Sequence, residues 1–161
     1  MQSLFEICQG ATLVEFPADE VLLPEGTTSG HLYVLKDGMV EVLRGDTQVA
    51  TVGEPGALFG EMSVLLNRPH TATVRTMTPC TFYVFDDAAS FLRSNPEIAY
   101  HVAKLIAGRL NAATSYLADI KQQFEDRTDH LGMVGEVLDT LMHNQEEEFK
   151  PGPERETDSR L

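Results

Sequence analysis

The chain reads Phe-Gly-Glu-Met-Ser-Val-Leu-Leu-Asn-Arg-Pro-His-Thr-Ala-Thr-Val from Phe59 to Val74. The glycine in this stretch permits the backbone to approach a neighbour closely, which a side chain would block. A short apolar stretch follows, and Asn-Arg-Pro interrupts it before a β-branched run. The pattern predicts a short helical turn that begins near Met62 and a strand over Thr73–Thr76.

Short apolar or β-branched runs, separated by turn residues, fill the chain on both sides of this stretch. The predicted strands are Thr12–Phe16, Val21–Leu23, Leu32–Leu35, Met39–Leu43, Val49–Val52, Thr73–Thr76 and Thr81–Phe85. Asp37-Gly38 favours a two-residue hairpin, because a type I′ turn needs positive φ at both of its central positions. Strands this short and this closely spaced are typical of a sandwich, a barrel or a jelly roll.

The stretch from Phe59 to Val74 resembles the phosphate-binding cassette of the cyclic nucleotide-binding domain family. That family includes the catabolite activator protein and the regulatory subunits of cyclic-AMP-dependent kinase. Its pattern is Phe-Gly-Glu, a small residue and aliphatics, then Pro-Arg, a small or hydroxyl residue, Ala and a β-branched run. The resemblance implies an α+β fold, in which a β-roll or jelly roll precedes a long dimerisation helix and a short extra helix. Asp19 stands near a family glycine, and Asp tolerates a left-handed backbone better than most residues.

The resemblance also implies a cyclic nucleotide, cAMP or cGMP, as the ligand, with no metal. The Glu61 carboxylate would accept a hydrogen bond from the ribose 2′-hydroxyl, and backbone N–H groups of the short helical turn would face the phosphate. Thr71 would add a hydroxyl and its own N–H, and Ala72 a second backbone donor. The implied cassette residues are Gly60, Glu61, Met62, Ser63, His70, Thr71 and Ala72.

His70 stands where the family has its phosphate-binding arginine. Arginine offers phosphate a permanently charged fork, whereas histidine offers one or two donors and is charged only when protonated. Three interpretations stay open. His70 contacts the phosphate itself, Arg68 swings in from two residues upstream, or the pocket is vestigial and the domain only dimerises. We favour binding, because the rest of the cassette is intact.

A long helix is predicted to begin at Ser94-Asn95-Pro96-Glu97, which combines a capping residue, an early proline and a first-turn glutamate. Its apolar positions recur at steps of three and four: Ile98, Val102, Leu105 or Ile106, Leu110, Ala113, Leu117, Ile120 and Phe124. The helix either packs on its own β-roll or pairs through its distal half with a second copy, and we favour the homodimer. By resemblance, Thr114 and Ser115 would reach the adenine, although two ordinary surface hydroxyls explain them equally well.

Composition and charge limit the classes of partner. The 161 residues are 42% hydrophobic, and 12 basic against 25 acidic side chains leave a net charge of −13, which disfavours nucleic acid. We expect a β-roll with its long helix over 1–128, a short amphipathic helix over 129–143 and an acidic disordered tail over 144–161. Residues 126–161 hold ten Asp and Glu against four Lys and Arg, which argues against a DNA-reading module. Two cysteines and the absence of a signal peptide or membrane span fit a reducing cytoplasm.

We therefore expect a cytoplasmic sensor that binds a cyclic nucleotide, cAMP in the first instance, and that contacts neither nucleic acid nor membrane. An enzyme of the metal-dependent cupin type is disfavoured, because the histidines are scattered without a His-x-His pair. The alternative is a degenerate pocket in a dimeric module that presents its shorter helix and acidic tail to an unidentified protein partner.

Overall fold

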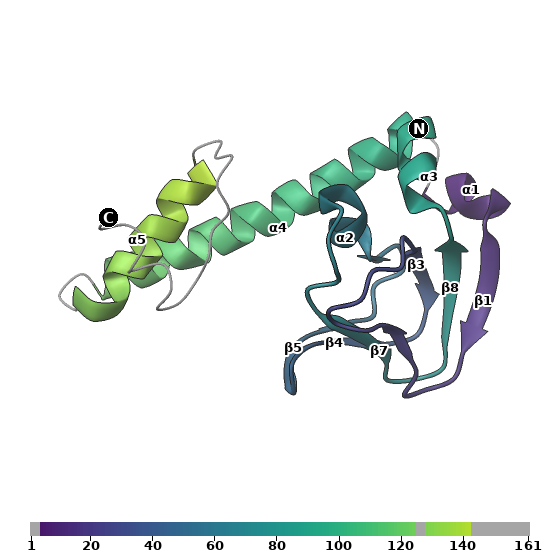
Figure 1. Ribbon diagram of the computed structural model, residues 1–161, viewed down its shortest axis with the longest axis horizontal. Coiled ribbons are helices and arrows are strands. Elements are labelled where there is room, and N and C mark those ends of the chain that lie inside the picture. Colours follow the sequence, from purple (N-terminus) through teal and green to yellow (C-terminus); the bar gives the residue numbers. More distant parts are fainter. Residues whose placement is uncertain (1–3, 125–127, 143–161) are drawn as a thin grey trace. The chain divides into compact units, whose positions relative to one another are not determined.

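The computed structural model describes residues 4–124 and 128–142 (Figure 1). The chain forms two compact units, Met1–Ala103 and Lys104–Leu161. The first unit contains every strand and the shorter helices of the N-terminal two thirds. The second contains most of the long helix and the helix that follows it.

Two four-stranded antiparallel sheets build the first unit. One sheet has the order β1-β8-β3-β6 and the other has the order β2-β7-β4-β5. The strands of the first sheet are β1 (Thr12–Phe16), β8 (Cys80–Phe85), β3 (Leu32–Asp37) and β6 (Leu58–Phe59). Those of the second sheet are β2 (Val21–Leu23), β7 (Thr73–Thr76), β4 (Val40–Arg44) and β5 (Thr47–Val52). The β-roll predicted from the sequence is confirmed.

The core lies between the two sheets. The second sheet contributes Leu22, Leu23, Val40 and Val74, and the first contributes Leu35, Phe59, Cys80 and Phe82. Phe82 is fully buried, and its ring meets those of Phe16, Tyr33 and Phe59 edge-on at centroid distances of 5.8, 5.8 and 6.2 Å. Edge-to-face pairs add about 0.5–1.5 kcal/mol each beyond the area they bury. This aromatic cluster therefore joins all four strands of the first sheet.

The hairpin predicted at Asp37-Gly38 is wrong. β3 and β4, on either side of it, belong to different sheets, so this turn carries the chain from one sheet to the other. Gly38 has φ +111°, and a Cβ there would lie 2.7 Å from the Pro79 carbonyl oxygen. The two-residue hairpin is instead formed at Gly45-Asp46, where β4 and β5 pair from Arg44 and Thr47 onward.

The helices follow local signals, and several are short. They are α1 (Leu4–Ile7), a 3-10 turn η1 (Cys8–Gly10), α2 (Glu61–Leu66), α3 (Ala88–Ser94), α4 (Pro96–Gln123) and α5 (Thr128–Met142). α4 begins at the predicted proline. α3 was not predicted from the sequence; its first turn is capped by the Asp87 carboxylate, which accepts a hydrogen bond from the Ser90 N–H at 3.3 Å. Within the described ranges, no helix is both long enough and apolar enough to cross a membrane.

Burial falls along α4. Ile98 and Val102, which belong to the first unit, are buried. In the second unit, Leu117 and Ile120 are half-buried, whereas Leu110 and Phe124 are exposed. α5 matches the helix predicted over 129–143, and its Gly135 lies close to α4, since a Cβ there would be 3.6 Å from Lys121 Nζ. The tail predicted over 144–161 lies outside the described residues.

Candidate functional site

Gly60 fixes the backbone between β6 and α2. Its φ of +93° lies in the left-handed region, and a Cβ at this position would overlap the carbonyl oxygen of His31. Only glycine satisfies both conditions without strain. Gly60 therefore lies close to the backbone that leads into β3, and its close approach to a ligand stays a prediction.

Glu61 follows directly as the first residue of α2 and is 4% exposed. An acidic side chain is favoured at the start of a helix, because free N–H groups give that end a partial positive charge. Met62, the next residue, is exposed. The short helical turn predicted near Met62 is confirmed. It begins at Glu61, so the buried carboxylate lies at the start of the cassette.

Ser63 is buried, and its hydroxyl donates a hydrogen bond to the carbonyl oxygen of Arg68. The Arg68 N–H donates in return to the Ser63 carbonyl at 3.1 Å. Asn67 lies between them in the left-handed region with φ +53° and ends the helix. The Ser63 hydroxyl therefore closes the loop after α2, and its contribution toward a ligand would come from its backbone.

His70 is 5% exposed, and its Nε2 lies 2.9 Å from the hydroxyl oxygen of Ser29. Its backbone is paired with the loop before β3: the His70 N–H donates to Thr27 O and the Gly26 N–H donates to His70 O, both at 2.8 Å. Burial, and then the charge of His31, hold the pKa of His70 below 6.5. The ring is thus held against Ser29 in surroundings that disfavour its protonated form, whereas the side chain of Arg68 is exposed.

No local sequence pattern predicts that His31 and His70 both lie beside Ser29. The Ser29 hydroxyl accepts a hydrogen bond from the His31 N–H at 3.2 Å, so this serine links the two histidines. The His31 ring stacks on Tyr33 at a centroid distance of 6.3 Å, and its Nδ1 lies 3.2 Å from Asp86 Oδ1. His31 and His70 are 39 positions apart in the sequence, and the folding of the sheets brings both to Ser29.

The segment after His70 is fixed from two neighbouring elements. Arg44 Nε, at the end of β4, donates to the carbonyl oxygen of Thr71 at 3.1 Å, and Thr71 itself is exposed. Ala72 is half-buried. The Thr73 hydroxyl accepts a hydrogen bond from the Glu25 N–H at 3.0 Å. The predicted cassette residues from Gly60 to Ala72 all lie in the first unit, whereas Thr114 and Ser115 lie in the second. A role for those two on adenine stays a prediction.

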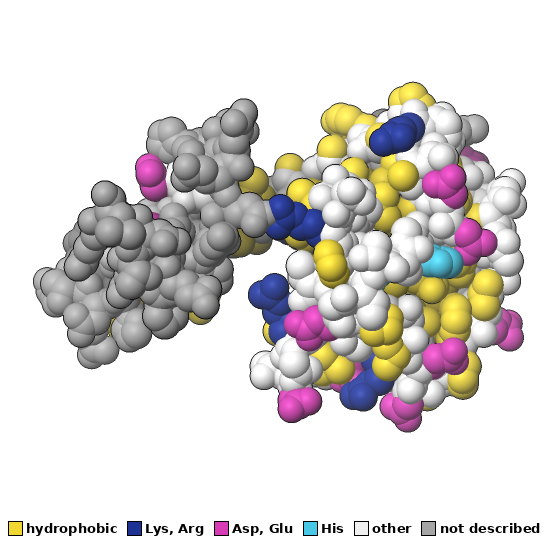
Figure 2. Space-filling model, in the orientation of Figure 1, with side chains coloured by type: hydrophobic (Ala, Val, Ile, Leu, Met, Phe, Trp, Pro, Cys, Tyr) yellow, Lys and Arg dark blue, Asp and Glu magenta, His cyan; other side chains and the backbone are white. Residues whose placement is uncertain are grey.

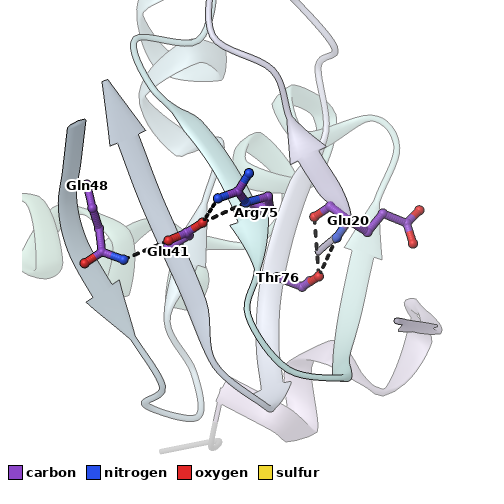
Figure 3. A network of polar contacts seen from close by, with 5 residues as sticks. All are labelled: Glu20, Glu41, Gln48, Arg75 and Thr76. Atoms are coloured by element: carbon purple, nitrogen blue, oxygen red, sulfur yellow. Dashed lines mark hydrogen bonds and ion pairs between the residues drawn. The ribbon is translucent and has the colours of Figure 1, made fainter. Parts of the chain in front are cut away.

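A second polar network ties the strands of the second sheet together (Figure 3). Glu41 accepts hydrogen bonds from Gln48 and Arg75, and these bonds lower the pKa of its carboxyl group. Nearby, the Thr76 hydroxyl accepts from the Glu20 N–H at 2.9 Å. The Arg75 guanidinium is therefore hydrogen-bonded to the Glu41 carboxylate on the same sheet. Among the described residues, no group of three or more His, Cys, Asp or Glu is placed to hold a metal ion.

Comparison with known proteins agrees with this geometry. The sequence model of the family described as "Cyclic nucleotide-binding domain" matches residues 13–93, about half of the chain. The chain belongs to the cyclic nucleotide-binding domain family. The resemblance found in the cassette is therefore confirmed for the β-roll as a whole.

Relatives and solved structures carry the same domain in different settings. The "CRP-like cAMP-activated global transcriptional regulator" of Mycobacterium tuberculosis is 29% identical over 113 residues, which are 66% of this chain and 50% of that protein. A cGMP-dependent protein kinase of Drosophila melanogaster is 33% identical over 73 residues, 45% of this chain and 7% of the kinase. The chain thus spans half the length of the regulator that it matches.

Two structures share the fold of this cyclic nucleotide-binding domain. The N-terminal domain of a transcriptional regulator from Streptomyces coelicolor A3(2) has a TM-score of 0.51 at 27% identity, covering 70% of this chain and 82% of that one. The structure titled "Sp-2Cl-cAMPS bound to PKAR CBD2" has a TM-score of 0.53 at 20% identity, covering 67% and 75%. The second likeness concerns the fold alone.

Proposed function

We propose that this protein is a regulatory sensor that binds a cyclic nucleotide, in the first instance cAMP, at the cassette from Gly60 to Ala72. The observation that carries the proposal is the pairing of a left-handed glycine, pressed against His31 O, with a buried carboxylate directly after it. A buried carboxylate at a helix start is suited to accept a hydrogen bond from a ribose hydroxyl. Family membership and a relative named as cAMP-activated support cAMP as the first ligand to test.

Calorimetric titration with cAMP, cGMP and linear AMP tests the proposal. We expect cAMP to bind and AMP to bind far more weakly, and the ratio of cAMP to cGMP affinity gives the base preference. Glu61→Ala leaves the ribose hydroxyl without its acceptor, at a cost of about 1–3 kcal/mol, which is a roughly tenfold to hundredfold loss of affinity. Glu54→Ala removes an exposed carboxylate from the same unit and serves as the matched control. The proposal fails if no cyclic nucleotide binds.

A second candidate function follows from the buried position of His70 beside Ser29. The ring is held against Ser29, and its lowered pKa disfavours the charged form that would attract a phosphate. In that case the β-roll would be a degenerate pocket within a dimeric module that engages a protein partner. Thermal melting separates the two functions, because a ligand at 100 times its dissociation constant stabilises by about 2.7 kcal/mol.

We further infer a homodimer through α4. Leu110, Tyr116 and Phe124 are 43%, 66% and 41% exposed in the single chain, which leaves apolar surface along the distal helix. Pairing with a second copy would cover this surface, as in the two-helix seams of coiled coils. Direct contact with nucleic acid is disfavoured by the acidic balance, and on the face shown in Figure 2 the described basic side chains do not gather into one patch. Both buried cysteines are unpaired, which suits a reducing cytoplasm.

A further inference from the structure

A bound phosphate monoanion is stabilised by a nearby cation, and the surroundings of His70 disfavour the charged form of its ring. The His70 ring is buried against Ser29 with a lowered pKa. Arg75 is bonded to a carboxylate on its own sheet. Arg68 closes the loop after α2 through its backbone, and its side chain does not share the buried side of His70. Arg44 is a further cation beside the cassette, because its Nε donates a hydrogen bond to the Thr71 carbonyl oxygen.

The alternation of β4 places Arg44 on the inner face of its sheet. Val40 is buried in the core and Val42 packs against it, whereas Glu41 between them faces the opposite side. The register of β4 against β7 is regular from Val40 to Leu43, so the period of two is kept along β4. Arg44, two residues after Val42, therefore leaves the strand on the same side as Val42, and at the end of β4 its side chain is exposed.

The guanidinium is already anchored to the cassette. Its Nε donates to the Thr71 carbonyl oxygen at 3.1 Å, and no described residue accepts a hydrogen bond from its two terminal nitrogens. The turn after Arg44 is held as well, because the Gly45 N–H donates to Glu25 Oε2 at 2.9 Å and the Glu25 N–H donates to Thr73. One oxygen of the Glu25 carboxylate thus accepts a hydrogen bond from the turn. The hydrogen bond from Nε places the arginine beside Thr71.

We propose that Arg44 is the phosphate-binding cation of this protein and takes the part that an arginine at position 70 would otherwise have. With Nε bonded to Thr71 O, the two terminal amino groups offer a planar pair of donors to two phosphate oxygens. The charge is permanent, so it does not depend on the protonation of His70. This inference rests on the proposed binding of a cyclic nucleotide and names the residue that neutralises its phosphate.

Titration with cAMP of the wild type and three variants of Arg44 tests the inference. Arg44→Ala is expected to weaken binding by about tenfold to a hundredfold, the usual loss for a charge-assisted hydrogen bond. Arg44→Lys keeps the charge and should recover part of the affinity. Arg44→Gln can still donate to Thr71 O but carries no charge, and should bind as weakly as Arg44→Ala. Lys36→Ala removes an exposed cation of β3, outside the cassette, and is the control that should bind like the wild type.

A double-mutant cycle with His70→Arg separates charge from shape. An arginine at position 70 supplies a second cation, so Arg44→Ala should cost less affinity in the His70→Arg background than in the wild type. Wild-type affinity should also stay constant from about pH 5.5 to 8, a range on either side of the usual histidine pKa of about 6.5. If His70 were the cation, affinity would decline as pH rose through that range.

The outcomes distinguish this inference from the function on which it rests. If the wild type binds cAMP and Arg44→Ala binds equally well, the function stands and the role of Arg44 is overturned. If Arg44→Gln recovers affinity and Arg44→Lys does not, the residue only positions Thr71, which also overturns it. If the wild type binds neither cAMP nor cGMP while remaining folded, the proposed function has failed and this inference fails with it.

Discussion

Replacing Gly60 by alanine perturbs the site at its most constrained position. The new Cβ would sit at a backbone φ of +93° and would overlap the His31 carbonyl oxygen. Left-handed backbone costs a residue other than glycine about 1–2 kcal/mol. Overpacking against an atom that cannot rotate away adds about 1–3 kcal/mol. We therefore expect Gly60→Ala to lower the free energy of unfolding by about 2–5 kcal/mol, a large part of the usual 5–15 kcal/mol.

Urea unfolding followed by circular dichroism measures this loss directly. With an m value of about 2 kcal/mol/M, the midpoint should fall by about 1–2.5 M. Gly26→Ala is a matched control, because Gly26 has a similar φ of +81° but nothing within 4 Å of a Cβ, so it should lose only the backbone part of about 1–2 kcal/mol. Equal losses at the two glycines would refute the argument that contact with His31 makes Gly60 indispensable.

Two further predictions concern pH and assembly. The folded state holds the pKa of His70 below 6.5, so the unfolded chain binds this proton more readily, and stability should decline as pH is lowered through and below 6.5. His70→Gln should flatten that decline, as measured by urea midpoints at several pH values; parallel curves for the two proteins would contradict the assignment. Leu117→Glu places a charge in the proposed seam of α4 and should yield a folded monomer by sedimentation. Ala118→Glu, at an exposed position on another side of the helix, should not. A monomeric wild type at high micromolar concentration would rule out the dimer.

The strands were predictable because their signals are local. Thr12–Phe16, Val21–Leu23 and Thr73–Thr76 have the bounds that their β-branched runs indicate. Asp19 adopts φ +62°, as its place near a family glycine suggested. The two-residue strand β6 escaped notice, because Leu58–Phe59 is too short to show an alternation.

The error at Asp37-Gly38 has a physical cause. The dipeptide correctly signals a positive φ, but pairing partners are chosen by packing between the sheets. In this fold β3 pairs with β6 and β8, and β4 pairs with β5 and β7. Turn chemistry fixes the local backbone and leaves open whether the chain returns to the same sheet or crosses to the other.

The candidate site was predictable only in part for the same reason. Gly60 and Glu61 belong to one contiguous motif, so the sequence shows them together. The approach of Arg44 to Thr71 joins residues 27 positions apart, and the link from Ser29 to His70 joins residues 41 apart. Both contacts depend on the register of strands in two sheets, which one sequence does not reveal.

The thiols of Cys8 and Cys80 can be used to measure how often the first unit opens. Cys8 is fully buried and burial raises its pKa to about 11, while Cys80 is 2% exposed and packs against Gly38. A thiol reagent reacts with the thiolate, so neither cysteine can be modified until the β-roll opens around it. The rate of labelling under native conditions therefore measures how often this unit opens, and its slowing by a nucleotide would report binding. The chain has two cysteines and neither lies beyond Ala103, so the same measurement is blind to any rearrangement of the distal part of α4 or of α5.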